Sequence, residues 1–140
     1  MTWERVVAQI MKVQSVDRAL AERIFDQTLG YLLLCSRRPE LGDGPWLLGP
    51  SPEVDKGVHV FYLYTPELFE LFESINNGVF IHHVPNDKPG AERRAVRLQT
   101  VEAFRLLNMS FDSELWASLA HGCANEDGEG PPNCFDNSDG

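Results

Sequence analysis

Apolar residues recur at three- and four-residue steps near the start of the chain, which is the spacing of one face of an α-helix. The first stripe consists of Trp3, Val6, Val7, Ile10 and Met11. It predicts an amphipathic helix that ends near Gln14. A second stripe runs from Val16 to Cys35, and we expect Ser15 to cap this longer helix. That helix should end at Arg37-Arg38-Pro39, because proline disfavours helical geometry in the residue before it.

Two tripeptides further along combine a hydroxyl, a proline and an acid, namely Ser51-Pro52-Glu53 and Thr65-Pro66-Glu67. A hydroxyl can cap a helix, proline fits the first helical position, and an acid suits the positive end of the helix dipole. We therefore predict helices over Pro52–Tyr64 and Pro66–Asn76. The glycine-rich stretch Glu40–Pro50 before them is predicted to be a loop that places Trp46 on the core.

The pattern changes after the second of these helices. Val79–Pro85 is short and β-branched, so it is predicted to be extended. A further helix is predicted over Ala91–Asn108, and either Asp112 or Ser113 would cap a last short helix. The residues of the long helix expected to face inward are Val96, Leu98, Val101, Phe104 and Leu107.

These elements predict a mainly α protein, a single compact domain of five to six helices that spans residues 1–120. Residues 121–140 differ in composition, with five acidic residues, no Lys or Arg, and Phe135 as the one large apolar side chain. Such a segment buries too little apolar surface to offset its ordering entropy. We therefore predict a disordered acidic C-terminal tail.

The charge balance limits the classes of partner. The chain has 12 basic and 21 acidic side chains, and only five of the acids lie in the predicted tail. Affinity for phosphate backbones comes mostly from clustered Lys and Arg, so we expect no nucleic-acid partner. The longest apolar run, Tyr31–Cys35, is far too short to cross a bilayer, so we expect no membrane partner either.

The cysteines indicate the compartment. Cys35, Cys123 and Cys134 make an odd count, which fits a reducing environment better than a disulfide framework. The N-terminal residues carry charges at Glu4 and Arg5 and lack the continuous apolar run of a signal peptide. We therefore expect a soluble, cytoplasmic protein.

Three of the four histidines, together with one aspartate, are candidates for a functional site. Asp55 and His59 are four residues apart on one helix, so they share a face and can interact. His82 and His83 follow on an extended segment, where adjacent side chains point to opposite sides, so at most one of them should face the same site. Two histidines and one carboxylate are a set that binds zinc or iron, and a carboxylate beside an imidazole also suits acid-base catalysis.

The predicted tail offers a second candidate. His121, Cys123 and Cys134 could form a soft-ligand site for a divalent metal such as zinc. The simpler hypothesis is that these residues are part of an unstructured segment without a ligand.

Asp55, His59, His82 and His83 lie within or near three short runs of sequence: SPEVDKGVH at 51–59, LYT at 63–65 and GVFIHHVP at 78–85. They resemble the bacterial members of the glycine-rich-domain-containing protein family, whose pattern is approximately PSxxVDxxWHxFIL followed by YxxFC and GxFIHHxP. The upstream helix is similar too, so the resemblance covers about residues 15–87. It implies that the family's aspartate, histidine and histidine pair correspond to Asp55, His59, His82 and His83.

Two positions depart from that pattern. The tryptophan before the family's histidine is Val58 here, and the tyrosine and cysteine of YxxFC are replaced within Leu68–Phe72. If that cysteine is a metal ligand in the family, this chain has lost it. The resemblance implies a site and no reaction, because the family has no established activity.

Two functional hypotheses remain. The first is a helical interaction module for a protein or peptide partner, in which Asp55, His59 and His82 have a structural role. The second is a metal-dependent or acid-base enzyme that uses Asp55, His59 and either His82 or His83. Trp3, Trp46 and Trp116 also supply apolar surface that a homodimer could bury.

Overall fold

The computed structural model describes residues 3–83 and 90–117, and helices make up most of these ranges. In chain order they are α1 (Glu4–Gln14), α2 (Arg18–Ser36), the 3-10 turn η1 (Arg38–Leu41), α3 (Pro52–Phe61), α4 (Thr65–Ile75), α5 (Gly90–Leu106) and α6 (Ser113–Ala117). The described residues contain six α-helices and no strand, so the prediction of a mainly α single compact domain is confirmed. The predicted disordered tail, residues 121–140, lies outside the described residues.

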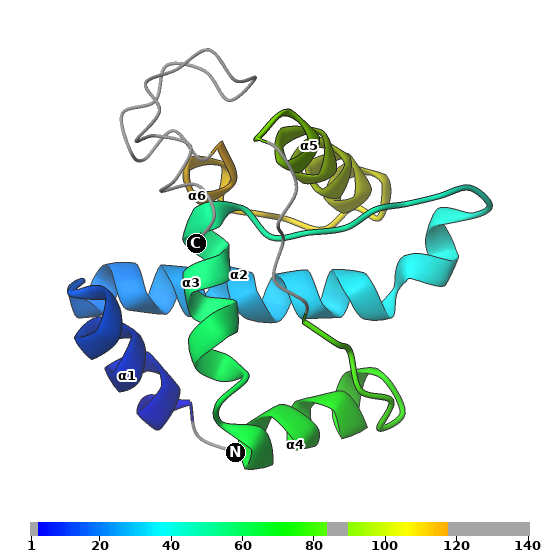
Figure 1. Ribbon diagram of the computed structural model, residues 1–140. Helices are drawn as coiled ribbons and strands as arrows, with labels where there is room; N and C mark the ends of the chain where they lie inside the picture. Colours follow the sequence, from blue (N-terminus) through cyan, green and yellow to red (C-terminus); the bar gives the residue numbers. More distant parts are fainter. Residues whose placement is uncertain (1–2, 84–89, 118–140) are drawn as a thin grey trace.

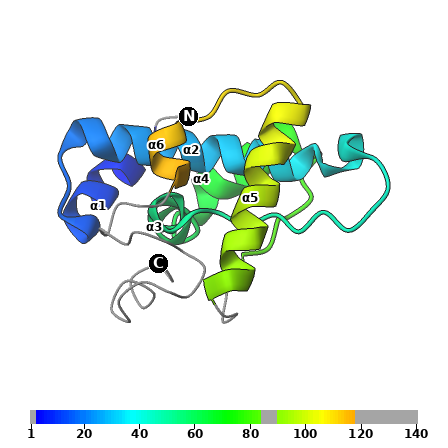
Figure 2. The same ribbon diagram turned by 90° about the horizontal axis from the view of Figure 1, so that it is seen from above.

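α2 is the central element (Figure 1). α1 and α3 pack against it, α5 and α6 lie along its upper edge in that view, and Figure 2 shows α5 crossing over it from above. Its buried residues occur on several faces: Ala21, Ile24, Phe25, Gln27, Thr28, Tyr31, Leu32 and Leu34. Among the described helices, none has both the length and the apolar character required to cross a membrane.

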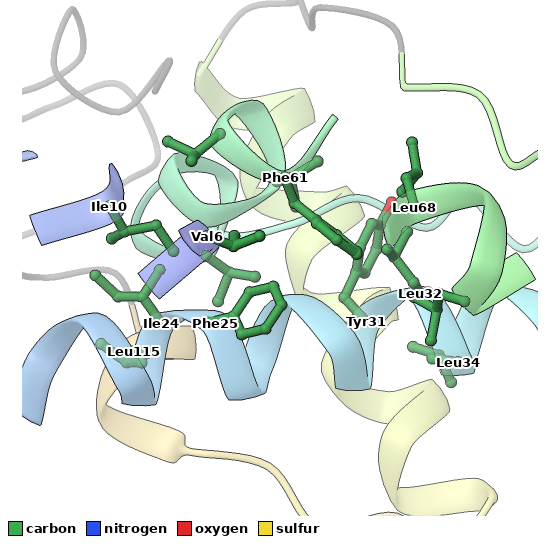
Figure 3. Close-up of a cluster of buried hydrophobic side chains, with 14 of the residues drawn as sticks. Val6, Ile10, Ile24, Phe25, Tyr31, Leu32, Leu34, Phe61, Leu68 and Leu115 are labelled. Carbon is green, nitrogen blue, oxygen red and sulfur yellow. The ribbon is translucent and has the colours of Figure 1, made fainter. Parts of the chain in front are cut away.

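One part of the core lies where α1, α2 and α3 meet. The rings of Trp3, Phe25 and Phe61 pack edge to face, with centroids 5.1–5.6 Å apart. Val6 and Ile10 of α1 converge on the same region (Figure 3). Edge-to-face aromatic packing adds stability beyond the area that the rings bury.

A second part of the core joins α2 to α5 and α6. Trp116 packs between Tyr31 and Phe104, with ring centroids 6.2 and 5.2 Å away. The indole Nε1 of Trp116 donates a hydrogen bond of 2.8 Å to Oε1 of Gln27, which also accepts from the backbone N–H of Asp112. These bonds supply partners for polar groups that burial would otherwise leave unsatisfied.

Several helix starts differ from the sequence predictions. Ser15 does not cap α2; it adopts a left-handed conformation (φ 54°) that ends α1, and the side chain of Asp17 caps α2 by accepting from Leu20 N. Thr65 makes no capping hydrogen bond and is already the first residue of α4. For α6 the prediction is confirmed: Asp112, one of the two predicted caps, accepts from Leu115 N through its carboxylate.

Two predictions about the helices need correction. α3 ends at Phe61, three residues before the predicted Tyr64, because the chain must turn there into α4. Leu98 is 50% exposed and does not face the core, whereas Phe104 is buried as predicted. Residues 79–83 are irregular and form no strand, and the rest of the segment predicted to be extended lies outside the described residues.

The crossing of α2 and α3 is unusually close at Gly57. A Cβ atom at this position would lie 2.2 Å from Thr28 Oγ1 and 2.8 Å from Ile24 Cγ2. The Thr28 hydroxyl is fully buried and donates to the carbonyl of Ile24, so it has its own partner within α2. A residue without a side chain is therefore required at position 57 for the two helices to approach this closely.

We predict that Gly57→Ala destabilises the protein by about 1–3 kcal/mol, because the added methyl group overpacks the crossing. The matched control is Gly30→Ala within α2, where a Cβ would meet nothing within 4 Å. That variant should be more stable than the wild type by about 0.5–1 kcal/mol, since alanine is the better helix former. Urea unfolding followed by circular dichroism measures both changes. Equal effects of the two substitutions would contradict a steric role of Gly57.

Candidate metal centre

The start of α3 is fixed by Ser51. Its hydroxyl is fully buried, accepts from the backbone N–H of Val54 at 3.2 Å, and donates to the carbonyl of Leu115 at 2.8 Å. Pro52 occupies the first helical position, where its missing N–H is not needed. The cap therefore begins α3 and also attaches it to α6.

α3 has an apolar face that enters the core and a polar face beside it. Val54, Gly57, Val58 and Phe61 recur at three- and four-residue steps, are buried, and include the contact of Gly57 with α2. A second set, Asp55, His59 and Tyr62, follows the same spacing one residue further on, so it forms a neighbouring face. The apolar face of α3 thus determines where this polar face points.

Residues 79–83 pass along the polar face of α3. The hydroxyl of Tyr62 donates a hydrogen bond to the carbonyl of Ile81, and the ring of Phe80 packs against Tyr62 and Phe72, with centroids 5.9 and 5.3 Å away. His83 then lies with its ring centroid 4.8 Å from that of His59. This irregular segment therefore brings a residue that follows α4 back to α3.

Asp55, His59 and His83 form one cluster. Asp55 Oδ2 lies 3.2 Å from Nε2 of His59, and Asp55 Oδ1 lies 3.4 Å from Nε2 of His83. One ligand atom from each of the three residues can be chosen so that all lie within 4.8 Å of one another. The Asp55 and His83 side chains are only 10% and 17% exposed, whereas His59 is 41% exposed, so the cluster is open to solvent on the side of His59.

Two buried atoms of this cluster have no hydrogen-bond partner within the part of the chain that the structure describes. They are Asp55 Oδ1 and His83 Nε2, the two atoms that face each other at 3.4 Å. Their separation is within hydrogen-bond range, but their alignment is not that of a hydrogen bond. A buried carboxylate oxygen without a partner is costly, so the arrangement is unusual for a purely structural cluster.

The pKa values of Asp55, His59 and His83 are shifted mainly by burial, in the direction opposite to the one that an ion pair between them would produce. Burial raises the pKa of Asp55 to about 7. Burial lowers the pKa of His59, and burial together with the charge of His59 lowers that of His83. The neutral forms of all three groups are therefore favoured relative to exposed side chains. A neutral imidazole has the free lone pair that a metal ion requires.

Of His82 and His83, one belongs to the cluster. His83 joins Asp55 and His59, whereas His82 is exposed and its ring packs on Phe80 at 5.0 Å. The prediction that at most one histidine of the pair faces this site agrees with that geometry. The second candidate set in the tail, His121, Cys123 and Cys134, lies outside the described residues.

Tyr62 was not among the residues singled out from the sequence. Its spacing is a usable signal, since Tyr62 lies three residues after His59 and seven after Asp55, at the C-terminal cap of α3. Its contact with residues 79–83 depends on the path of the chain after α4, which no local pattern specifies.

Comparison with known proteins identifies no relative, since no protein-family model, no curated protein and no solved structure matches this chain. The geometry of the site is therefore the basis for any functional proposal.

We predict that Asp55→Asn stabilises the metal-free protein at pH 8 by about 1–3 kcal/mol, because it removes a buried charge that folding disfavours. Folding raises the pKa of Asp55 from 3.8 to about 7. The free energy of unfolding of the wild type therefore falls as the pH rises between these two values, because the unfolded chain loses this proton more easily than the folded protein. The difference between the two proteins should therefore disappear below pH 4. Chemical unfolding in the presence of a chelator measures it.

The control is Asp43→Asn, at an exposed residue in the loop before α3. It should leave stability unchanged at both pH values. A loss of stability in Asp55→Asn at pH 8 would instead mean that Asp55 forms a favourable structural pair with the two histidines.

Proposed function

We propose that this domain binds one divalent transition-metal ion through Asp55, His59 and His83. The observation that supports this most strongly is a pair of buried atoms, Asp55 Oδ1 and His83 Nε2, that face each other at 3.4 Å and have no hydrogen-bond partner among the described residues. A positive ion between them would use both lone pairs and favour the ionised form of Asp55. A structural cluster would instead be expected to satisfy these atoms through hydrogen bonds.

The distances in the cluster also suit a metal ion. Nitrogen and oxygen ligands lie about 2.0–2.2 Å from zinc, so two ligands of one ion at tetrahedral or octahedral angles are about 3.0–3.5 Å apart. The carboxylate of Asp55 lies 3.2 Å from one imidazole nitrogen and 3.4 Å from the other. The ligand atoms of the whole set lie within 4.8 Å of one another, so the side chains must move closer together for all three to reach one ion.

The ligand set indicates the type of metal and of chemistry. Two imidazoles and one carboxylate suit zinc or iron(II). Three protein ligands would leave at least one coordination position free, and the exposure of His59 supports access of solvent to the ion. A metal ion with an open position can activate a water molecule or polarise a substrate oxygen. We therefore favour the hypothesis of a metal-dependent enzyme over that of an interaction module.

The other hypotheses stay predictions. They include a protein or peptide partner, a homodimer, a cytoplasmic location and membership of the glycine-rich-domain-containing protein family. The motifs that resemble this family contain Asp55, His59 and His83, but the family has no established activity, so the resemblance does not favour a metal site over a structural cluster.

The test is metal binding by the full chain and by variants in which single histidines are replaced. We expect about one zinc or cobalt(II) ion per wild-type chain by elemental analysis after metal loading and desalting. His59→Ala and His83→Ala should lose this ion, because each removes one of three protein ligands. His82→Ala is the matched control, since it removes the neighbouring histidine that faces away from the cluster.

The tail cysteines require a separate control. A Cys123→Ser/Cys134→Ser variant should retain the metal if the ion is bound at Asp55, His59 and His83. Absence of metal from the loaded wild type would refute the proposal, and so would equal losses in His82→Ala and His83→Ala.

A further inference from the structure

Tyr62 lies between the two parts of the chain that provide the metal ligands. It follows α3, which carries Asp55 and His59, and its hydroxyl donates to the carbonyl of Ile81, two residues before His83. Its ring also packs against the ring of His83, with the centroids 5.5 Å apart. A single side chain therefore contacts both the backbone and the imidazole of the segment that supplies the third ligand.

The hydroxyl of Tyr62 is suited to this contact. A tyrosine hydroxyl can donate one hydrogen bond, and the carbonyl of Ile81 accepts it here. The aromatic rings of Phe72 and Phe80 pack against Tyr62 at 6.4 and 5.9 Å, which limits the rotation of its side chain. The donor is therefore held in a fixed position relative to α3.

His83 depends on such a contact more than His59 does. His59 is fixed by its helix, whereas His83 lies on irregular backbone that pairs with no strand among the described residues. A metal ligand on irregular backbone must be oriented by surrounding residues, and loss of such residues weakens metal binding.

We infer that Tyr62 is the positioning residue for His83 in the metal site, through its hydrogen bond to Ile81 and its ring contact with the imidazole. This inference rests on the proposed metal-binding function. It assigns Tyr62 no contact with the ion itself, because its hydroxyl is bound to the Ile81 carbonyl. Its effect on the metal is therefore indirect and should appear at His83 alone.

The test is cobalt(II) titration of full-length Tyr62→Phe, followed by its visible absorption. This variant keeps the ring and loses the hydroxyl. We expect its cobalt affinity to fall by about tenfold, which is within the range for residues that orient metal ligands. The matched control is Tyr64→Phe, since Tyr64 contacts Arg5 and lies two residues further along the chain. Its cobalt affinity should equal that of the wild type.

A second measurement separates positioning from a general effect on folding. In proteins loaded with one equivalent of zinc, the ring-nitrogen NMR shifts of His59 and His83 report which imidazoles are bound. In Tyr62→Phe the zinc-induced shift should weaken for His83 and persist for His59.

The outcomes distinguish the two proposals. If the wild type binds no cobalt, the proposed metal-binding function fails and this inference fails with it. If the wild type binds cobalt but Tyr62→Phe behaves like Tyr64→Phe, only the positioning role is wrong. Equal weakening of the His59 and His83 shifts would also overturn it, because the variant would then distort the whole site.

Discussion

The close crossing of α2 and α3 is the constraint on which the rest of the structure depends. With no side chain at Gly57, the backbone of α3 lies against Thr28 and Ile24, and the apolar face of α3 enters the core. Because the residues of a helix keep a fixed angular relation, this contact also sets the direction of Asp55 and His59. The packing of the core and the orientation of the candidate metal ligands thus have the same origin.

The helices were predictable from the sequence because their signals are local. The apolar periodicity gave α1 and α2 nearly at their observed bounds, and Ser51-Pro52 predicted the start of α3. The errors occurred where two local signals compete. Ser15 and Asp17 can both cap a helix, and the outcome depends on where α1 ends, which is set by the left-handed turn at Ser15. Thr65 resembles a cap, but the chain is already helical there.

The candidate site was predictable to the extent that it lies on one helix. The spacing of Asp55 and His59 predicts their contact, because residues four apart on a helix are neighbours. The choice between His82 and His83 requires the register of residues 79–83 relative to α3. That register depends on the packing of Phe80 and on the hydrogen bond from Tyr62 to Ile81, both of which are tertiary contacts. Local periodicity alone therefore could not select the third residue.

Asp55 has opposite effects on the stability of the metal-free domain and on the proposed binding of a metal ion. A buried position next to the α2–α3 crossing favours an apolar or fully hydrogen-bonded side chain. Asp55 lies there instead, and one of its carboxyl oxygens has no hydrogen-bond partner among the described residues. Ionising this group in the folded, metal-free protein is costly, as its raised pKa indicates. A bound cation would reverse the sign of that electrostatic energy, because it favours the carboxylate over the acid. The same burial that makes Asp55 unfavourable in the metal-free protein would therefore strengthen its attraction to a metal ion.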